Sequence, residues 1–369
     1  MTRPAGVGII GAGNVLWAYL QMLDRLVPRG LAREGPICAR ERGAWPAILR
    51  RRPGALLVAS AREVLESDVD VVVVITSPDA HADLAKSALE HGKHVLVEKP
   101  LAPSAAEGRA LVELAGERGL HLLAAPFVQL SPTFRVLWTL VHEGAIGDVH
   151  SARGLYGNAG SHWSAWYHAS GVGPLTEAGI YNLKSLTALL GPVVEVQAAD
   201  GRSTISRVID GHAIDDPDPD VSHVLLRHAF GALSSVVSGQ AIQRYRRPAL
   251  ELYGTAGSVN LLGDDWDPRG IEVWRNATGR WELIEPVDST WLWADGLREL
   301  VLALRDGRPP LAESAHDLHL LDIVAAAREA TSTGSAAHVS SDFPPLSLRL
   351  DSPQGVEQLH DHTRSPDEQ

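Results

Sequence analysis

The sequence predicts two domains: an α/β domain at the N-terminus and an α+β domain after it. A chain of 369 residues is long for a single hydrophobic core and sufficient for two. Its first third alternates short β-branched runs with helical segments, the pattern of a parallel sheet with crossover helices. From about residue 126, consecutive strands with short turns favour a largely antiparallel sheet with helices on one face. We therefore predict domains at 1–125 and 126–350 and a polar tail at 351–369.

The order of elements follows from where the apolar runs begin and end. Residues 69–75 form the clearest strand, because this run is too β-branched and too short for a helix. In the first domain we expect strands at 7–10, 69–75, 94–97 and 122–127, and helices at 79–90 and 104–119. In the second we expect helices at 132–142, 177–190, 291–305 and 315–330, and strands at 149–156, 221–227, 232–237, 250–253, 271–274 and 281–284.

Composition excludes several classes of partner. A formal charge of -12 and a pI near 5.7 argue against nucleic acid and anionic membranes, which are themselves polyanionic. Cys38 is the single cysteine, so neither an intramolecular disulfide nor a cysteine-rich metal site is expected. We find no signal-peptide pattern and no run of about 20 apolar residues. We expect a cytoplasmic protein that binds no metal.

A glycine turn follows the first predicted strand directly. Gly11 permits a tight turn, Gly13 allows the backbone to approach a pyrophosphate, and Asn14 and Val15 lead into a helix. The third glycine of this dinucleotide fingerprint is replaced by Leu16, so a glycine turn in some other α/β protein is the alternative. The position after a strand and before a helix favours a dinucleotide site.

The region of the second strand bears on the choice of cofactor. An acidic residue there usually holds the ribose 2′-hydroxyl of NAD, but Ala39 and Arg40 stand at the expected place. A guanidinium fits the geometry of a 2′-phosphate, whereas the neighbouring Glu41 keeps NAD possible. We expect NAD or NADP, with a slight preference for NADP.

Three segments carry a set of motifs, which are Gly-Ala-Gly-Asn at 11–14, Thr-Ser-Pro-Asp-Ala-His at 76–81 and Val-Leu-Val-Glu-Lys-Pro-Leu at 95–101. Together they resemble the glucose-fructose oxidoreductase/inositol dehydrogenase/rhizopine-catabolism (Gfo/Idh/MocA) family, and the resemblance extends from about residue 7 to 343. It implies a Rossmann domain followed by an α+β domain with an open-faced sheet, which would also form a homo-oligomer. It further implies a nicotinamide cofactor, a sugar or glycoside substrate, and cofactor-binding roles for Thr76, Ser77, Pro78, His81, Glu98 and Lys99.

The same resemblance makes Lys99 the leading catalytic residue, because an ammonium there orients the reacting hydroxyl and favours its deprotonation. A surface lysine at a strand end is the alternative. The family's substrate helix usually carries an aspartate and, four residues later, a histidine. Here Glu177 and Tyr181 occupy those places, and Lys184 follows on the face of Tyr181.

Tyr181 acting as the base requires a lowered pKa, since a free tyrosine has a pKa of about 10. A nearby cation typically lowers such a pKa by ~1–3. We therefore predict a Tyr181–Lys99 proton-handling pair assisted by Lys184, with simple hydrogen bonding of substrate by Tyr181 as the alternative.

An aromatic segment before this helix suits a sugar ring, because aromatic faces pack against the apolar faces of pyranoses. The predicted substrate-binding residues here are His162, Trp163, Trp166, Tyr167 and His168, with the two histidines as reserve bases; a packed loop is the alternative. The expected reaction is hydride transfer at a secondary alcohol, at a ring carbon such as C3. The rivals are a glycoside lyase or glycosidase with transient redox at bound NAD, and a non-catalytic sugar or dinucleotide sensor.

Overall fold

The computed structural model describes residues 3–160, 168, 173–204, 206–209, 211–215, 218–246 and 248–350. The chain forms two compact units. Unit 1 comprises Met1–Phe127, Leu292–Glu329 and Val339–Pro344, and unit 2 comprises Val128–Trp291, Ala330–His338 and Pro345–Gln369. The chain therefore returns to unit 1 after it has formed most of unit 2. A single boundary near residue 125, as predicted from the sequence, does not include this return.

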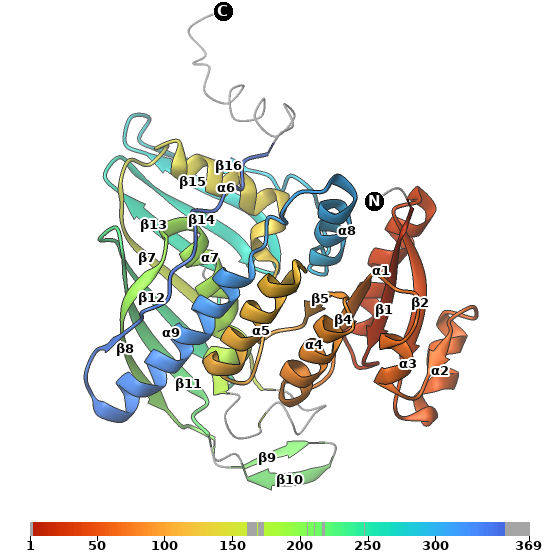
Figure 1. The fold of residues 1–369 in the computed structure, drawn as a ribbon. Coiled ribbons are helices and arrows are strands. Elements are labelled where there is room, and N and C mark those ends of the chain that lie inside the picture. Colours follow the sequence, from red (N-terminus) through yellow and green to blue (C-terminus); the bar gives the residue numbers. More distant parts are fainter. Residues whose placement is uncertain are drawn as a thin grey trace, which may run out of the picture. The chain divides into compact units, whose positions relative to one another are not determined.

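Unit 1 contains a six-stranded parallel sheet, which confirms the predicted α/β class (Figure 1). Its strand order is β3-β2-β1-β4-β5-β6. The short β-branched runs form its centre, since all four residues of β4 are buried. The strands are β1 (Ala5–Ile10), β2 (Ala32–Cys38), β3 (Leu57–Val58), β4 (Val71–Val74), β5 (His94–Val97) and β6 (Leu122–Ala124). Since β6 ends at Ala124, the strand predicted at 122–127 is shorter than expected.

Helices cover both faces of this sheet. On one face, α3 (Ala61–Leu65), α4 (His81–Glu90) and α5 (Ala105–Arg118) share a core with alternate strand residues. On the other, α1 (Leu16–Leu26) lies against α8 (Gly296–Asp306), which contacts β1, β5 and β6. The remaining helices are α2 (Trp45–Arg51) and α9 (Ser314–Thr333). The helix predicted at 291–305 begins later, because residues 292–295 form a turn closed by Asp295 N donating to Leu292 O.

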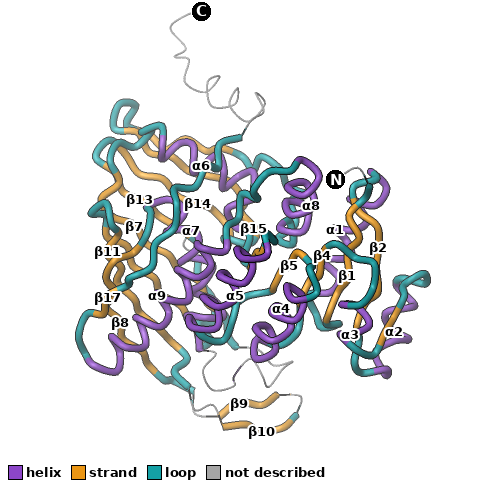
Figure 2. Tube along the Cα trace, viewed as in Figure 1, coloured by secondary structure: helices purple, strands orange, loops and turns teal. Residues whose placement is uncertain are grey.

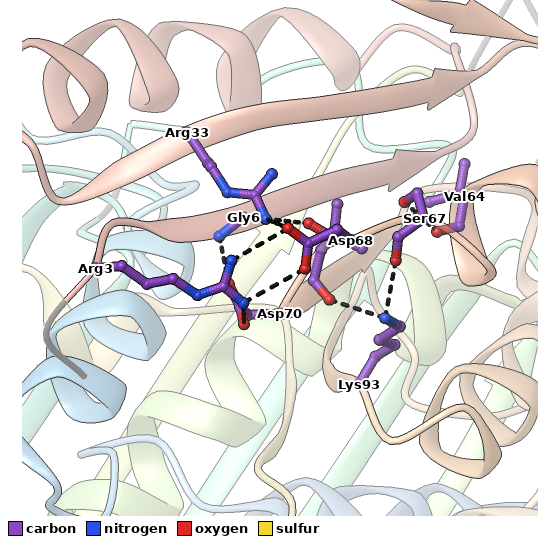
Figure 3. Close-up of polar contacts among 9 residues, drawn as sticks. Arg3, Gly6, Arg33, Val64, Ser67, Asp68, Asp70 and Lys93 are labelled. Carbon is purple, nitrogen blue, oxygen red and sulfur yellow. Dashed lines mark hydrogen bonds and ion pairs between the residues drawn. The ribbon is translucent and has the colours of Figure 1, made fainter.

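The amino ends of the strands carry an ionic network (Figure 3). Arg3 pairs with Asp70 (2.9 Å) and with Asp68 (3.2 Å), and Arg33 also pairs with Asp68 (2.8 Å). Lys93 Nζ donates to the carbonyls of Ser67 and Val69 at 3.0 and 2.9 Å. These contacts join the segments that lead into β1, β4 and β5. The glycine turn lies at the opposite edge of the sheet, which is formed by the carboxyl ends of the strands. Ligands bind at this edge in such folds.

Unit 2 is built on a large sheet, whose strands are drawn in orange in Figure 2. The order of its nine strands is β16-β15-β14-β13-β7-β12-β11-β8-β17, and β12 and β7 form the one parallel pair of this sheet. This confirms the largely antiparallel sheet. The strands are β7 (Val149–Gly157), β8 (Val193–Gly201), β11 (Val221–His228), β12 (Leu233–Gly239), β13 (Leu250–Gly254), β14 (Gly257–Asp264), β15 (Asp267–Arg275), β16 (Arg280–Ile284) and β17 (Ala337–His338). A separate hairpin is formed by β9 (Ser206–Ile209) and β10 (His212–Asp215).

Two helices lie on one face of this sheet. They are α6 (Pro132–His142), which contacts β15, and α7 (Ile180–Leu190), which contacts β7 and β12. The predicted helix 177–190 is not one α-helix, because a π-helical turn at Leu175–Gly179 precedes α7. Side chains on β11 alternate between buried and exposed, as expected for a sheet with one covered face. No helix in the described part of the chain is both long and apolar enough to cross a membrane.

Candidate active site

The glycine turn lies between β1 and α1, as the sequence predicts. Gly11 has a φ of 117°, and a Cβ at this residue would meet the backbone oxygen of Ile75 at 2.6 Å. Gly13 differs, since a Cβ there would meet nothing within 4 Å. Gly11 therefore packs the turn against the residue that follows β4, whereas Gly13 faces open space. Such a cradle fits the close approach of a pyrophosphate.

The start of α1 supports the same ligand. Val15 stands at its N-cap with no side-chain hydrogen bond to the helix, and the first turn has no acidic residue. The amide groups at a helix N-terminus attract anions when no side chain satisfies them. Leu16, which replaces the third glycine, is completely buried, so its side chain belongs to the core. The exposed Asn14 lies beside Gly13.

The end of β2 carries the residues that bear on the 2′-position of the cofactor. Ala39 is buried, and its carbonyl accepts a hydrogen bond from the Trp45 indole (2.8 Å). The side chain of Arg40 is 89% exposed, and its Nε lies 3.6 Å from Glu41 Oε1. The first side chain after the strand that can project into solvent is therefore a cation, with an acid beside it.

The Glu-Lys-Pro turn follows β5 and is tied to the glycine-turn helix. The Tyr19 hydroxyl, from α1, donates to Glu98 Oε1 at 2.8 Å, and both side chains are buried. The backbone N–H of Lys99 donates to Glu98 Oε2 at 3.2 Å. Trp293 packs edge-on against Tyr19, with ring centroids 6.0 Å apart. Glu98 thus holds the backbone of Lys99, and α1 holds Glu98. These contacts fix the backbone position from which the half-buried Lys99 side chain extends.

His81 joins two predicted cofactor-binding turns. Its Nδ1 lies 2.8 Å from Pro100 O and its Nε2 lies 3.1 Å from Thr76 O. The side chain is completely buried, and burial lowers the pKa of the imidazole. Half-buried Thr76, Ser77 and Pro78 follow β4 at the edge that also carries the glycine turn. A direct contact of His81 with cofactor remains a prediction, whereas its contacts with the two turns are present.

In unit 2 the predicted substrate residues lie at the start of α7. Glu177 belongs to the π-helical turn, so the four-residue α-helical spacing does not relate it to Tyr181. Glu177 and Lys184 are both buried, Lys184 completely. Any assistance from the Lys184 ammonium would therefore come from inside the protein. Tyr181 is half-buried and stacks on Tyr156 of β7, with centroids 5.5 Å apart and planes at 19°.

The aromatic segment lies mostly outside the described residues. This applies to His162, Trp163, Trp166 and Tyr167. His168 is described and is buried. The substrate-binding roles assigned to this segment therefore stay predictions.

Several residues near the predicted site are not apparent from the sequence. Tyr19 lies three residues after Leu16 on the inner face of α1, and this helical spacing is the one signal that could indicate it. Tyr156 is the next-to-last residue of β7, and nothing in its own segment points to Tyr181. Asp264 ends β14 and Asp265 follows it in the turn, and both contact residues that are distant in sequence.

The fold and the glycine turn define a two-domain oxidoreductase with an NAD-binding Rossmann domain. Residues 5–125 match the model of the oxidoreductase family with an NAD-binding Rossmann fold, and residues 134–260 match the GFO/IDH/MocA C-terminal domain. Together these matches cover more than half of the chain. The protein therefore belongs to the Gfo/Idh/MocA oxidoreductase family, as the sequence motifs predict.

Its curated relatives are dehydrogenases and reductases. The chain is 26% identical to trans-1,2-dihydrobenzene-1,2-diol dehydrogenase of Bos taurus, covering 72% of this chain and 76% of the relative. It is 31% identical to a dTDP-3,4-didehydro-2,6-dideoxy-alpha-D-glucose 3-reductase of Actinomadura kijaniata, covering 58% and 64%. Levoglucosan dehydrogenase of Pseudarthrobacter phenanthrenivorans is 27% identical, covering 53% and 55%.

Solved structures share the fold over nearly the whole chain. An oxidoreductase domain protein from Kribbella flavida superposes with a TM-score of 0.82 at 22% identity, covering 92% of this chain and 100% of that one. Levoglucosan dehydrogenase in complex with NADH gives a TM-score of 0.81 at 20% identity, covering 92% and 100%. At these identities the likeness establishes the fold.

Proposed function

We propose that this protein is an NAD(P)-dependent dehydrogenase that oxidises a secondary alcohol of a sugar or glycoside. The observation that carries the proposal is the carboxyl-end edge of the unit 1 sheet, where the Gly11–Gly13 cradle and the uncapped start of α1 follow β1 and the Glu98–Lys99 turn follows β5, with β4 between these two strands. The names of the relatives, which include sugar and dihydrodiol dehydrogenases, support an alcohol substrate. A ring carbon such as C3 of the sugar is the proposed position of oxidation.

The proposed mechanism assigns cofactor binding and proton transfer to different residues. Gly13 and the first amides of α1 would hold the pyrophosphate of the dinucleotide. The bound nicotinamide would supply the redox chemistry, as the acceptor of the hydride from the substrate carbon. Lys99 orients the substrate hydroxyl and favours its deprotonation, and Tyr181 accepts the proton. Glu177 and the segment around His168 complete the proposed substrate contacts, with His162 and His168 as alternative bases. The completely buried Lys184 assists Tyr181 from inside the protein.

We further propose a preference for NADP. The support is the exposed Arg40 guanidinium at the end of β2, where NAD-specific enzymes place an acid. An Arg40→Ala variant is expected to lose kcat/KM with NADP while its kcat/KM with NAD changes little. Equal losses with both cofactors would contradict this assignment.

We also propose that the protein is a homo-oligomer. The support is the face of the nine-stranded sheet opposite α6 and α7, which exposes Leu225, Leu233, Tyr253, Trp281 and Leu283. Exposed apolar patches of this kind mark interaction surfaces. Light scattering on the Leu283→Glu variant should give a smaller particle than the wild type, and a monomeric wild type would contradict the proposal.

The function is tested by incubating purified protein with NAD or NADP and a panel of sugars and glycosides. Nicotinamide absorbance and products by mass spectrometry are followed together. The expected result is cofactor reduction matched by loss of two hydrogens from one sugar. Release of aglycone without net reduction would overturn the dehydrogenase in favour of transient oxidation, and cofactor binding without turnover on any member of the panel would favour a sensor.

The same assay tests the proposed base. Tyr181→Phe should reduce kcat by roughly 10²- to 10⁴-fold, the range typical of a lost general base. Unchanged turnover in this variant would leave His162 or His168 as the base.

A further inference from the structure

A buried carboxyl group lies in the turn between β14 and β15 of unit 2. The pairing of these strands shifts register between Leu261 and Gly263, as in a β-bulge. Gly263 has a φ of 80°, and a Cβ on it would meet Asp267 O at 2.6 Å. Bulges re-aim side chains at the ends of strands. Here the turn carries Asp265 to a completely buried position, although a residue at the tip of a hairpin is normally exposed.

Asp265 binds the substrate helix. Its Oδ2 accepts a hydrogen bond from Ser185 Oγ at 2.7 Å, and Asn182 Nδ2 donates to both carboxylate oxygens at 3.2 Å. Burial raises the pKa of this carboxyl to about 6, against the effect of these hydrogen bonds. Burying a carboxylate is costly. A turn that only had to close a hairpin would not need one.

The two bonded residues flank the proposed functional groups of α7. Asn182 follows Tyr181 directly, and Ser185 follows Lys184 directly. Asn182 is itself confined on its other side, because a Cβ on Gly154 of β7 would lie 2.7 Å from Asn182 Cβ. Asp265 therefore anchors α7 at the residues next to Tyr181 and Lys184, on a helix that begins after the irregular π-helical turn.

Asp264, which ends β14 directly before Asp265, contacts a tyrosine of the same unit. Tyr245 donates its hydroxyl to Asp264 Oδ1 at 2.5 Å. Burial and this hydrogen bond raise the pKa of the Tyr245 phenol. The Tyr181 ring itself stacks on Tyr156 of β7, so it is positioned by this stacking as well as by the anchored helix.

We propose that Asp265 is a positioning residue, which fixes the start of α7 and thereby the placement of Tyr181 in the proposed dehydrogenase site. The inference rests on the proposed function for its catalytic consequence, but the placement of Tyr181 can be measured without it. Because Asp265 is buried, it acts through Asn182 and Ser185 and does not touch the substrate.

The test uses Asp265→Asn, which keeps the size of the side chain. Its new amide N–H donor would face the Asn182 amide and Ser185 hydroxyl, which are themselves donors, so hydrogen bonds to α7 are lost. We expect kcat to fall roughly 10- to 100-fold, as for a displaced reactive group, while the dinucleotide Kd stays within about twofold because Asp265 lies in unit 2. In the double variant Asp265→Asn/Asn182→Asp, donor and acceptor change places, so the hydrogen bonds re-form and kcat should recover. Asp267→Asn is the matched control, since Asp267 begins β15 two residues after Asp265, has a side chain that is 44% exposed, and pairs with Arg269.

A spectroscopic measurement separates this inference from the proposed function. Fluorotyrosine is incorporated at position 181 of the full chain, and its ¹⁹F resonance is recorded for each variant. A resonance that shifts or broadens in Asp265→Asn and returns in the exchanged pair supports positioning, even if no substrate on the panel is oxidised. A resonance and kcat unchanged in Asp265→Asn, or a loss that the exchanged pair does not recover, would overturn it.

Discussion

The two glycines of the β1–α1 turn make a prediction that separates folding from cofactor binding. At Gly11, an alanine Cβ would lie 2.6 Å from Ile75 O and 2.7 Å from Ile75 C, both backbone atoms, at a φ of 117°. A strained φ costs about 1–3 kcal/mol and overpacking about 1–3 kcal/mol. Gly11→Ala should therefore lose roughly 2–6 kcal/mol of stability. At the ~2–4 °C per kcal/mol of larger domains, this lowers the melting temperature on the order of 10 °C.

Gly13→Ala should behave in the opposite way. Nothing lies within 4 Å of its added Cβ, so the melting temperature of the protein without cofactor should stay close to that of the wild type. The methyl group instead occupies the cradle and keeps a pyrophosphate from the backbone. Hydrogen bonds to charged groups are worth about 1.5–3 kcal/mol, so losing one raises the dinucleotide Kd roughly 10- to 150-fold.

The assay is thermal melting without cofactor, followed by calorimetric titration with NAD and NADP. Gly116→Ala on α5 is the control, because its Cβ also meets nothing within 4 Å and a helical alanine should add about 1 kcal/mol. A Gly13→Ala protein that binds both dinucleotides with the wild-type Kd would refute the assignment of this turn. A Gly11→Ala protein with the wild-type melting temperature would refute the packing argument.

Three further predictions follow from buried contacts. Tyr19→Phe removes a donor from Glu98 and should lower stability by ~1–3 kcal/mol and also reduce kcat, measured beside Tyr253→Phe on an exposed tyrosine. Burial lowers the pKa of His228 to about 4, so between pH 6.5 and 4 the unfolded chain binds a proton at this residue that the folded chain does not bind. As pH falls through this range, urea unfolding of the wild type should lose about 3 kcal/mol more than that of His228→Gln, in which His94 and the other buried histidines still titrate. Gly296→Ala places a Cβ 2.3 Å from the Phe127 ring and should cost ~1–3 kcal/mol by urea unfolding; an unchanged midpoint would show that the ring can move aside.

The fold could be predicted where one physical signal dominates. The valine run of β4 has a single satisfactory environment, the centre of a parallel sheet, and the structure places it there. The glycine turn was predictable because positive φ and close approach both require glycine. The strand β14 was not recognised, because Asn260 and Gly263 interrupt its apolar alternation. The pairing of β14 with β13 and β15 on either side makes it a strand, and its own residue pattern does not indicate this.

The candidate site was predictable only in part, and the missing part has a common cause. The Glu98–Lys99 turn is local in sequence and was assigned. By contrast, Asp265 meets Asn182 across 83 residues and Tyr19 meets Glu98 across 79. Such partners depend on how strands and helices pack, which a periodic pattern does not encode. The π-helical turn before α7 breaks the 3.6-residue spacing from which a shared face of Glu177 and Tyr181 was inferred.

The return of the chain to unit 1 has a consequence for the order of events during synthesis. Asp317 accepts a hydrogen bond from Ala124 N, Leu321 belongs to the core around β4 and β5, and α8 packs against β1. Asp317, Leu321 and α8 have not yet been synthesised when residue 127 leaves the ribosome. At about 5–20 residues per second, roughly 10–40 s pass before residue 329 follows. For that interval the first parallel sheet exposes an apolar face, so nascent chains stalled within unit 2 should be the species that chaperones retain.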